Sequence, residues 1–347
     1  MYYLKYRPQT IEEIDNEDVR TRLKNVLSKK TISHSWLLTG PKGTGKTSSA
    51  RILAKAINCL DNIFADKGKS EEPCNKCDNC KLITNGSAMD VIEIDGASNR
   101  KIDDVRELID KLKFAPVHMR YKVYIIDEVH MLTSESFNAL LKTLEEPPAN
   151  TIFILATTEL DKLPKTIISR CLRLNFSHAK KEEVLRQLGR IVKGEKLTIS
   201  KDILESIAIN CDFSFRDSAK LLEEVVLNSI KTKEEFFNLI GLAENKEDLL
   251  HFVQEMDVKK VLIFIENYDI AGGSFKSLTE YLLEELHANL LAQNGVGEEK
   301  TKYQFNAKQT SVLIRLITES YGKLKMSPIE SLPLEMAILE YIQTQKI

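Results

Sequence analysis

Residues 40–47 form the pattern in this sequence with the most specific chemistry. They read Gly40-Pro41-Lys42-Gly43-Thr44-Gly45-Lys46-Thr47, which fits the phosphate-binding pattern G-x-x-x-x-G-K-[ST]. The glycines let the backbone curve so that several N–H groups point at phosphate oxygens, and the N-terminus of a following helix adds partial positive charge. Lys46 would reach the β- and γ-phosphates, and Thr47 would supply a hydroxyl ligand to Mg²⁺. We therefore predict that this loop, together with Ser48, binds ATP and Mg²⁺.

Two carboxylates, Asp127 and Glu128, supply the acidic element that a phosphate loop needs. They follow an apolar run at 123–126, and ligands of open α/β sheets bind where parallel strands end. By itself such a strand end would more often be a solvated acidic turn. Beside a phosphate loop, Asp127 is expected to hold Mg²⁺ through water, and Glu128 to polarise the water that attacks the γ-phosphate. Thr157 ends the next apolar run, where it could sense the γ-phosphate.

A group of cysteines gives a second, independent signal. Four of the six cysteines have the spacing C-x14-C-x2-C-x2-C, at Cys59, Cys74, Cys77 and Cys80. Four thiolates are the ligands of a closed, tetrahedral zinc site, and the polar segment between them needs such a staple to become ordered. An iron–sulfur cluster and free thiols are the alternatives. Because the phosphate loop belongs to the main sheet, we expect that metal loss disorders this insertion locally and leaves ATP binding largely intact.

The elements that position these residues are readable from the apolar pattern. Apolar runs that predict strands alternate with helical patterns through the first half of the chain, which indicates a parallel sheet covered on both faces. The expected strands are 35–39, 90–94, 122–126, 151–156 and 172–174. The expected helices between them are 47–58, 102–113 and 134–145. Beyond residue 178 the spacing is helical, at 180–192, 201–210, 215–230 and over most of 247–347.

This organisation predicts an α/β P-loop domain, a small helical lid and an all-helical C-terminal collar. The expected boundaries are 1–178, 179–241 and 242–347, with the cysteine insertion at 59–80. The net charge of the 347 residues is −2, so any contact with nucleic acid requires a local basic face. The first residues lack the apolar core of a signal peptide, and no apolar run is long enough to span a membrane. We therefore expect a cytoplasmic protein.

The combination of motifs resembles the bacterial clamp-loader gamma/tau family of AAA+ proteins, densely over residues 5–220. Besides the phosphate loop and the cysteines, the similar segments are Lys5-Tyr6-Arg7-Pro8, Glu93-Ile94-Asp95-Gly96-Ala97-Ser98-Asn99, Asp127-Glu128-Val129-His130-Met131-Leu132, Phe137 to Pro148, Leu163 to Cys171, and Leu332-Pro333-Leu334-Glu335-Met336-Ala337. The inserted cysteines distinguish this family from the eukaryotic and archaeal clamp-loader small subunits. In this family the longer tau form continues past the collar, into segments that bind the replicative helicase and the polymerase subunit.

The resemblance assigns roles that spacing alone does not. Arg170, in Ser169-Arg170-Cys171, would be an arginine finger that reaches the ATP of a neighbouring subunit. Arg216 would touch ATP in cis as a second sensor, and Tyr6 and Arg7 would line the adenine and ribose pocket. One residue departs from the pattern, because the family usually has glycine where this chain has Phe213.

The function that the resemblance implies is that of an ATPase motor subunit. With delta- and delta-prime-type partners and further gamma/tau copies, it would form a hetero-oligomer that opens a sliding clamp and loads it onto primed template DNA. The family is catalogued under DNA-directed DNA polymerase, but the sequence lacks the separated carboxylates of a two-metal polymerase site. Two rivals remain open. One is a non-hydrolysing, delta-prime-like member of such a complex, and the other is an AAA+ helicase or remodeller.

Overall fold

The computed structural model describes residues 1–30, 32–66, 68, 70–98, 114–240, 246–296, 303 and 305–345. The chain divides into two compact units. The first comprises Met1–Leu197 with Phe213–Glu223, and the second Thr198–Asp212 with Glu224–Ile347. The predicted helix at 102–113 lies outside the described residues. The division into three domains stays a prediction.

A five-stranded parallel sheet forms the centre of the first unit. Its strands lie in the order β2-β3-β4-β1-β5. They are β1 (Ser35–Thr39), β2 (Val91–Asp95), β3 (Lys122–Asp127), β4 (Thr151–Thr157) and β5 (Leu172–Asn175). The helices of the first unit are α1 (Tyr2–Lys5), α2 (Glu17–Leu27), α3 (Lys46–Asn58), α4 (Asp78–Thr84), α6 (Ser134–Glu145), α7 (Lys165–Ile168), α8 (Lys181–Glu195) and the start of α10 (Phe215–Leu227). Short 3-10 turns are η1 (Ile63–Ala65), η2 (Val129–Met131) and η3 (Leu160–Lys162).

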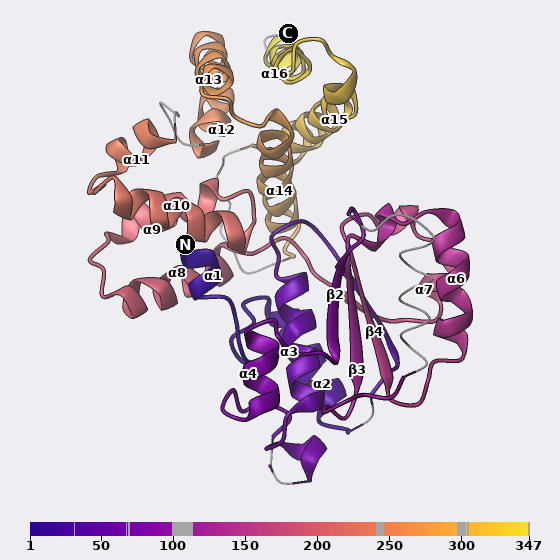
Figure 1. The fold of residues 1–347 in the computed structure, drawn as a ribbon. Coiled ribbons are helices and arrows are strands. Elements are labelled where there is room, and N and C mark those ends of the chain that lie inside the picture. The colour runs from indigo at the N-terminus through magenta and orange to yellow at the C-terminus, as the bar shows by residue number, and fades with distance from the viewer. Residues whose placement is uncertain are drawn as a thin grey trace. The chain divides into compact units, whose positions relative to one another are not determined.

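The sheet is buried on both faces, as its apolar runs predict. Successive side chains of β4 alternate between two cores, so that Ile152 and Ile154 pack with α2 and α3, whereas Phe153 and Leu155 pack with α6 and α7. Figure 1 shows α2 and α3 on one side of the sheet and α6 and α7 on the other. All three loops with predicted chemistry leave the carboxyl ends of β1, β3 and β4, where parallel strands open to a ligand.

The predicted strand boundaries agree with the structure to within one or two residues, and β2 shows why they differ. The strand begins at Val91, not at Asp90. The Asp90 carboxylate accepts hydrogen bonds from the backbone N–H groups of Val117, His118 and Met119, at 2.8, 2.8 and 2.9 Å. The Asp90 side chain therefore binds the loop at residues 117–119, and this fixes the position of the chain just before β2 begins.

Among its described residues the second unit contains helices and no strand. These are α9 (Lys201–Asn210), the end of α10, α11 (Lys233–Leu239), α12 (Lys246–Gln254), α13 (Val258–Ile270), α14 (Phe275–Gln293), α15 (Ala307–Lys323), the 3-10 turn η4 (Leu324–Met326) and α16 (Leu332–Gln345). On α14, Leu278, Leu282 and Leu286 lie four residues apart on one face of the helix and are buried. Gly272 separates α13 from α14 with a φ of 70°. No helix in the described ranges combines the length and apolar character that crossing a membrane requires.

Candidate nucleotide site and cysteine cluster

The first unit holds a cavity of about 290 Å³ at the carboxyl ends of its strands. Most of the predicted nucleotide-binding residues line it, namely Tyr6, Arg7, Lys42, Gly43, Thr44, Gly45, Lys46, Thr47, Ser48, Asp127, Glu128 and Arg216. Gly40 and Pro41 do not line the cavity, but their carbonyl oxygens accept hydrogen bonds from Lys46. Thr157 and Arg170 do not line the cavity. These predicted residues therefore lie together around one cavity, and their role in binding a nucleotide stays a prediction.

The phosphate loop needs its glycines for two different reasons. Gly43 has a φ of 80°, and a Cβ on it would lie 2.0 Å from Ser214 Oγ, so this glycine allows the loop to pack against the start of α10. Gly45 has a φ of 98° and precedes α3 as its N-cap, and a Cβ on it would meet no atom within 4 Å. Gly45 and the first residues of α3, Lys46, Thr47 and Ser48, line the cavity, so the helix N-terminus borders it, as an anion site at a helix N-terminus requires.

Lys46 is a buried cation aimed at backbone carbonyls. Its Nζ donates hydrogen bonds to the carbonyl oxygens of Gly40 and Pro41, both at 2.7 Å. Burial lowers the pKa of Lys46, although the nearby carboxylates of Glu128 and Asp127 oppose that shift. A phosphate would offer this amine a stronger, charged partner.

Thr47 and Asp127 are in direct contact, as a shared Mg²⁺ site would require. Thr47 Oγ1 donates to Asp127 Oδ2 at 2.6 Å, and Asp127 Oδ1 accepts from the N–H of Glu128 at 2.9 Å. A hydroxyl and a carboxylate at this separation are hard oxygen ligands suited to Mg²⁺. When bound, Mg²⁺ would neutralise phosphate charge at this place.

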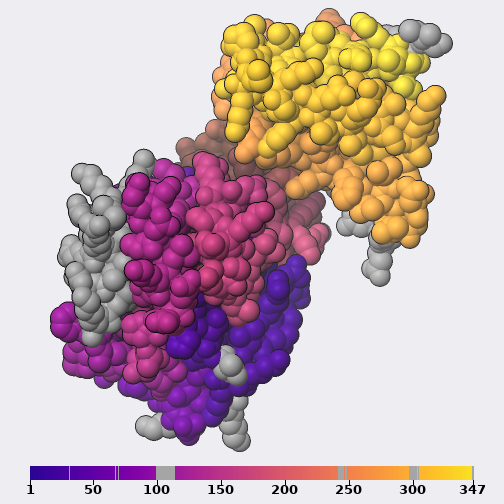
Figure 2. Space-filling model, turned by 90° about the vertical axis from the view of Figure 1, so that its right-hand side faces the viewer, coloured from indigo at the N-terminus to yellow at the C-terminus, as the bar shows by residue number. Residues whose placement is uncertain are grey.

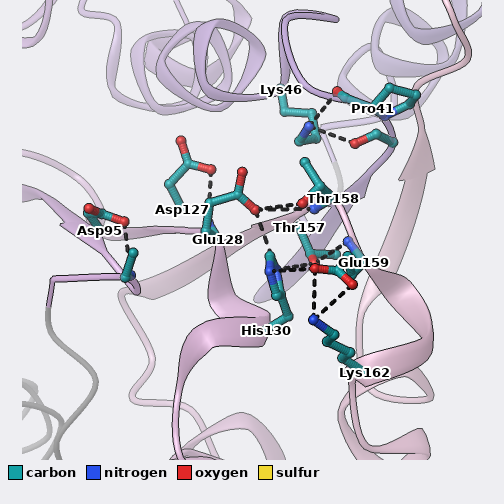
Figure 3. Close-up of polar contacts among 12 residues, drawn as sticks. Pro41, Lys46, Asp95, Asp127, Glu128, His130, Thr157, Thr158, Glu159 and Lys162 are labelled. Carbon is teal, nitrogen blue, oxygen red and sulfur yellow. Dashed lines mark hydrogen bonds and ion pairs between the residues drawn. The ribbon is translucent and has the colours of Figure 1, made fainter. Parts of the chain in front are cut away.

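Glu128 directly follows β3 and has a left-handed conformation with a φ of 46°. Its Oε2 accepts hydrogen bonds from the N–H and the hydroxyl of Thr158, at 3.3 and 3.0 Å (Figure 3). His130 Nδ1 lies 3.4 Å from the same oxygen and 3.0 Å from Thr157 Oγ1. Thr157 is fully buried, so it contacts Glu128 through His130 rather than facing the cavity.

The N-terminal segment and two helices form the wall opposite the phosphate loop. This wall consists of Tyr3, Tyr6, Arg7, Pro8, Ile14 and Asp15 with Gln187, Phe215 and Arg216. Tyr6 is fixed by a 2.7 Å hydrogen bond from its hydroxyl to Glu195. Burial lowers the pKa of Arg7, and the guanidinium of Arg51 adds to that effect. Asp15 and Gln187 carry no sequence signal of their own, because they enter the site through long-range packing.

Phe213 occupies a backbone position that favours glycine. Its φ is 54°, in the left-handed region that a side chain disfavours. The ring packs edge-on against His178, with centroids 5.3 Å apart, and the carbonyl accepts from the N–H of Ala179 at 3.1 Å. The residue therefore sets the direction in which the chain enters α10 and presents Arg216.

Arg170 lies at the surface of the first unit, beyond the lining of the cavity. Its guanidinium contacts Glu145 Oε1 at 2.6 Å and the carbonyl oxygen of Thr166 at 2.7 Å. Glu145 ends α6 and Arg170 follows α7; Figure 2 shows these segments on the surface of the first unit, in magenta and pink. Arg170 therefore does not contact its own phosphate loop.

The four predicted metal ligands come together at one point. The sulfur atoms of Cys59, Cys74, Cys77 and Cys80 all lie within 4.8 Å of one another. Four sulfurs around a tetrahedral zinc stand about 3.8 Å apart, so this cluster fits the metal with little adjustment.

Backbone N–H groups also point at these sulfur atoms. Those of Cys74 and Asp61 donate to Cys59 Sγ, and those of Lys76 and Cys77 donate to Cys74 Sγ. Burial raises the pKa of Cys74, but these N–H groups and the neighbouring thiols outweigh it and lower the pKa to about 7. Cys74 therefore favours the thiolate, which is the form that binds metal, whereas burial raises the pKa of Cys59 and Cys80.

Solved structures with similar folds include the RuvB Holliday junction branch migration motor of Thermotoga maritima. It is 17% identical, with a TM-score of 0.51 over 82% of this chain and 92% of that chain. Its R170A variant gives a TM-score of 0.52 over 87% of this chain and 99% of that one, also at 17% identity. At this identity the likeness concerns the fold alone.

Sequence comparisons are more specific. The family model described as "DNA polymerase III, delta subunit" matches residues 15–180. DNA polymerase III subunit tau of Bacillus subtilis is 50% identical over 225 residues, which cover 65% of this chain and 39% of that protein. DNA polymerase III subunit gamma of Buchnera aphidicola subsp. Acyrthosiphon pisum is 36% identical over 97% of both proteins. The gamma/tau protein of Mycoplasma genitalium is 35% identical over 96% of this chain and 58% of that protein. The chain belongs to the gamma/tau family of DNA polymerase III subunits.

Proposed function

We propose that this chain is the ATP-hydrolysing subunit of a bacterial clamp loader. The observation that carries the proposal is the convergence of Lys46, Thr47, Asp127 and Glu128 on one cavity. These are the four groups that phosphate binding, Mg²⁺ binding and water activation need. Membership of the gamma/tau family supports the same function.

In the proposed mechanism each side chain has one task. Lys46 leaves the carbonyls of Gly40 and Pro41 and binds the β- and γ-phosphates. Thr47 and Asp127 hold Mg²⁺. Glu128 orients the attacking water, and its own orientation is set by Thr158 and His130. Because His130 also contacts Thr157, a movement of Glu128 on binding or loss of the γ-phosphate would change the contacts of Thr157.

Several further assignments belong to the proposal. Arg216 would contact ATP in cis, and Tyr6 and Arg7 the nucleoside. Arg170 would act on the nucleotide of a neighbouring subunit, which agrees with its place outside its own cavity. The cysteine cluster would hold structural Zn²⁺, and the helical segments at 179–241 and 242–347 would be the lid and the oligomerising collar. The partners would be delta- and delta-prime-type subunits, further gamma/tau copies, the sliding clamp and primed template DNA, all in the cytoplasm.

A non-hydrolysing role within the same complex is the second candidate. The match to the delta-subunit family model favours it. The intact catalytic set argues against it, because a subunit that never turns over ATP has no need of Glu128 beside Asp127.

ATPase assays test the proposal and separate the candidates. The subunit assembled with delta- and delta-prime-type partners should hydrolyse ATP, and clamp together with primed DNA should stimulate it. Lys46→Ala is the control for contaminating ATPase. A complex whose turnover is unchanged by Lys46→Ala in this subunit would assign hydrolysis elsewhere and leave the non-hydrolysing role. Stimulation by DNA without clamp, and none by clamp, would instead favour a helicase or remodeller.

A further inference from the structure

The N-terminal strap, residues 3–15, joins the nucleotide cavity to the cysteine insertion. The first contact is made by Glu72, which lies between Cys59 and Cys74. Its two carboxylate oxygens accept from the backbone N–H groups of Ile11 and Glu12, at 2.7 and 3.0 Å. One side chain of the insertion therefore fixes two consecutive backbone groups of the strap. Because the acceptor is a carboxylate, these hydrogen bonds are stronger than those between neutral groups.

The second contact runs through Lys55, a buried cation near the end of α3 that is 1% exposed. Its Nζ donates to Gln9 Oε1 of the strap at 2.7 Å and to Asn75 Oδ1 of the insertion at 2.8 Å. The Gln9 side chain continues the path, because its Nε2 donates to the carbonyl oxygen of Arg7 at 3.0 Å. Thr84, at the end of α4, also contacts Gln9 and Lys55.

Both contacts depend on how the insertion is ordered. Glu72 stands two residues before Cys74, and Asn75 lies between Cys74 and Cys77 in a left-handed conformation. The segment between Cys59 and Cys74 is mostly polar. The buried Asn62 side chain donates to the carbonyl oxygens of Glu71 and Glu72, and a metal shared by the four cysteines would add a second constraint on this part of the insertion. A metal bound by the four thiolates would thus fix the position of the strap.

We propose that the metal-loaded cysteine insertion positions the strap, and so sets the affinity of the cavity for the nucleoside part of its ligand. Glu72 and Lys55 are the positioning residues. The inference rests on the proposed function, because it assumes that the cavity binds a nucleotide. It also departs from the expectation that the insertion and the nucleotide site are independent.

The division of the cavity makes the effect selective. Phosphates belong at the N-terminus of α3, and within the described ranges the loop before this helix has no hydrogen bond to the strap. The strap supplies Tyr3, Tyr6, Arg7 and Pro8 to the opposite wall, which is left for the base and ribose. Loosening the strap should therefore weaken binding of ATP, and leave binding of inorganic tripolyphosphate unchanged.

Calorimetric titration of the full chain with Mg-ATP and with Mg-tripolyphosphate tests this. Glu72→Ala should raise the Kd for ATP about tenfold, within the usual range of coupling between sites, and change that for tripolyphosphate by less than about twofold. Glu71→Ala is the matched control, because it removes the adjacent carboxylate, which has no hydrogen-bonding partner among the described residues. It should affect neither ligand. Retained tripolyphosphate binding also shows that the variant is folded.

Removing the metal supplies the second arm. In protein purified with its metal, a chelator should raise the Kd for ATP by a similar factor, and restoring Zn²⁺ should reverse the change. In Glu72→Ala the chelator should raise the Kd by less than it does in the unsubstituted protein, because this variant has already lost one of the two contacts through which the metal would act. Equal weakening of both ligands, an unchanged ATP affinity, or additive effects of chelation and Glu72→Ala would overturn the inference. If the unsubstituted protein binds neither ligand, the proposed function fails as well.

Discussion

Arg170 offers the sharpest test of whether catalysis is shared between subunits. Its guanidinium contacts Glu145 and the carbonyl of Thr166, and it does not line the chain's own cavity. Arg170→Ala should therefore leave the Kd for ATP within about twofold, because the side chain is not part of the site that binds it. It should lower turnover in the assembled complex by on the order of 10², the usual loss when one donor to a developing negative charge is removed.

The ion pair with Glu145 limits how much turnover could rise if Arg170 were released from it. The two side chains are 33% and 49% exposed, and such surface pairs are worth about 0–1 kcal/mol. Arg170 must break this pair to reach a neighbour's phosphate, so the pair lowers its availability by no more than about fivefold. Glu145→Gln should therefore raise turnover by at most that factor. The two variants should thus move the rate in opposite directions and by very different amounts.

Mixing variants provides the assay that a structural role for Arg170 cannot imitate. Complexes made only with Lys46→Ala or only with Arg170→Ala should both be nearly inactive. A mixed complex contains interfaces with an intact phosphate loop on one side and an intact arginine on the other, so part of the ATPase should return. If assembly is intact and mixing restores nothing above either variant alone, the role of Arg170 in trans is wrong.

Three other properties should follow from the same geometry. Because only the protonated amine attracts phosphate and burial lowers the pKa of Lys46, ATP affinity should fall as pH rises through that lowered pKa, below 10.5, and Lys46→Arg should remove this dependence in a titration series. Elemental analysis should find one zinc per chain, and iron with sulfide, or no metal, would contradict the assignment. In urea titrations, the free energy of unfolding of Phe213→Gly should exceed that of Phe213→Ala by about 1 kcal/mol, because both variants lose the ring but only alanine keeps the strain of the left-handed conformation. Equal free energies of unfolding would refute this explanation.

The parts of the site that follow from sequence are those encoded over short distances. The phosphate loop specifies its own backbone, and Asp127 and Glu128 are positioned by the strand that precedes them. The cysteines also come together as predicted, because three of them share two adjacent turns. In each case a local pattern fixes the geometry, and the parallel sheet only has to place the strand ends side by side.

The opposite wall of the cavity could not be predicted in the same way. Asp15 is 4% exposed, and its carboxylate accepts two hydrogen bonds from Arg190, at 3.1 and 2.8 Å, across 175 residues of sequence. Gln187 lies on α8, and its amide donates to the carbonyl of Phe215 at 2.9 Å. Neither residue belongs to a motif, and each is selected by tertiary contacts that spacing does not record. Thr157 illustrates the same limit, because its strand position was clear but its burial behind His130 was not.

Helix α3 explains why two sites that look separate in the sequence meet in the structure. It carries Lys46 and Thr47 at its first turn and Lys55 in its last, and Cys59 follows it directly as the C-cap. A helix of 13 residues is about 20 Å long and nearly rigid, so its two ends keep a fixed distance. The strap spans the same interval outside the helix, from Arg7 at the cavity to Gln9 and Ile11 at the insertion. The helix and the strap are joined at the end near the cysteine cluster, through Lys55 and Glu72. The position of the strap residues that line the cavity then depends on whether this end is held. The helix keeps the phosphate end independent of the metal, whereas the nucleoside end depends on it.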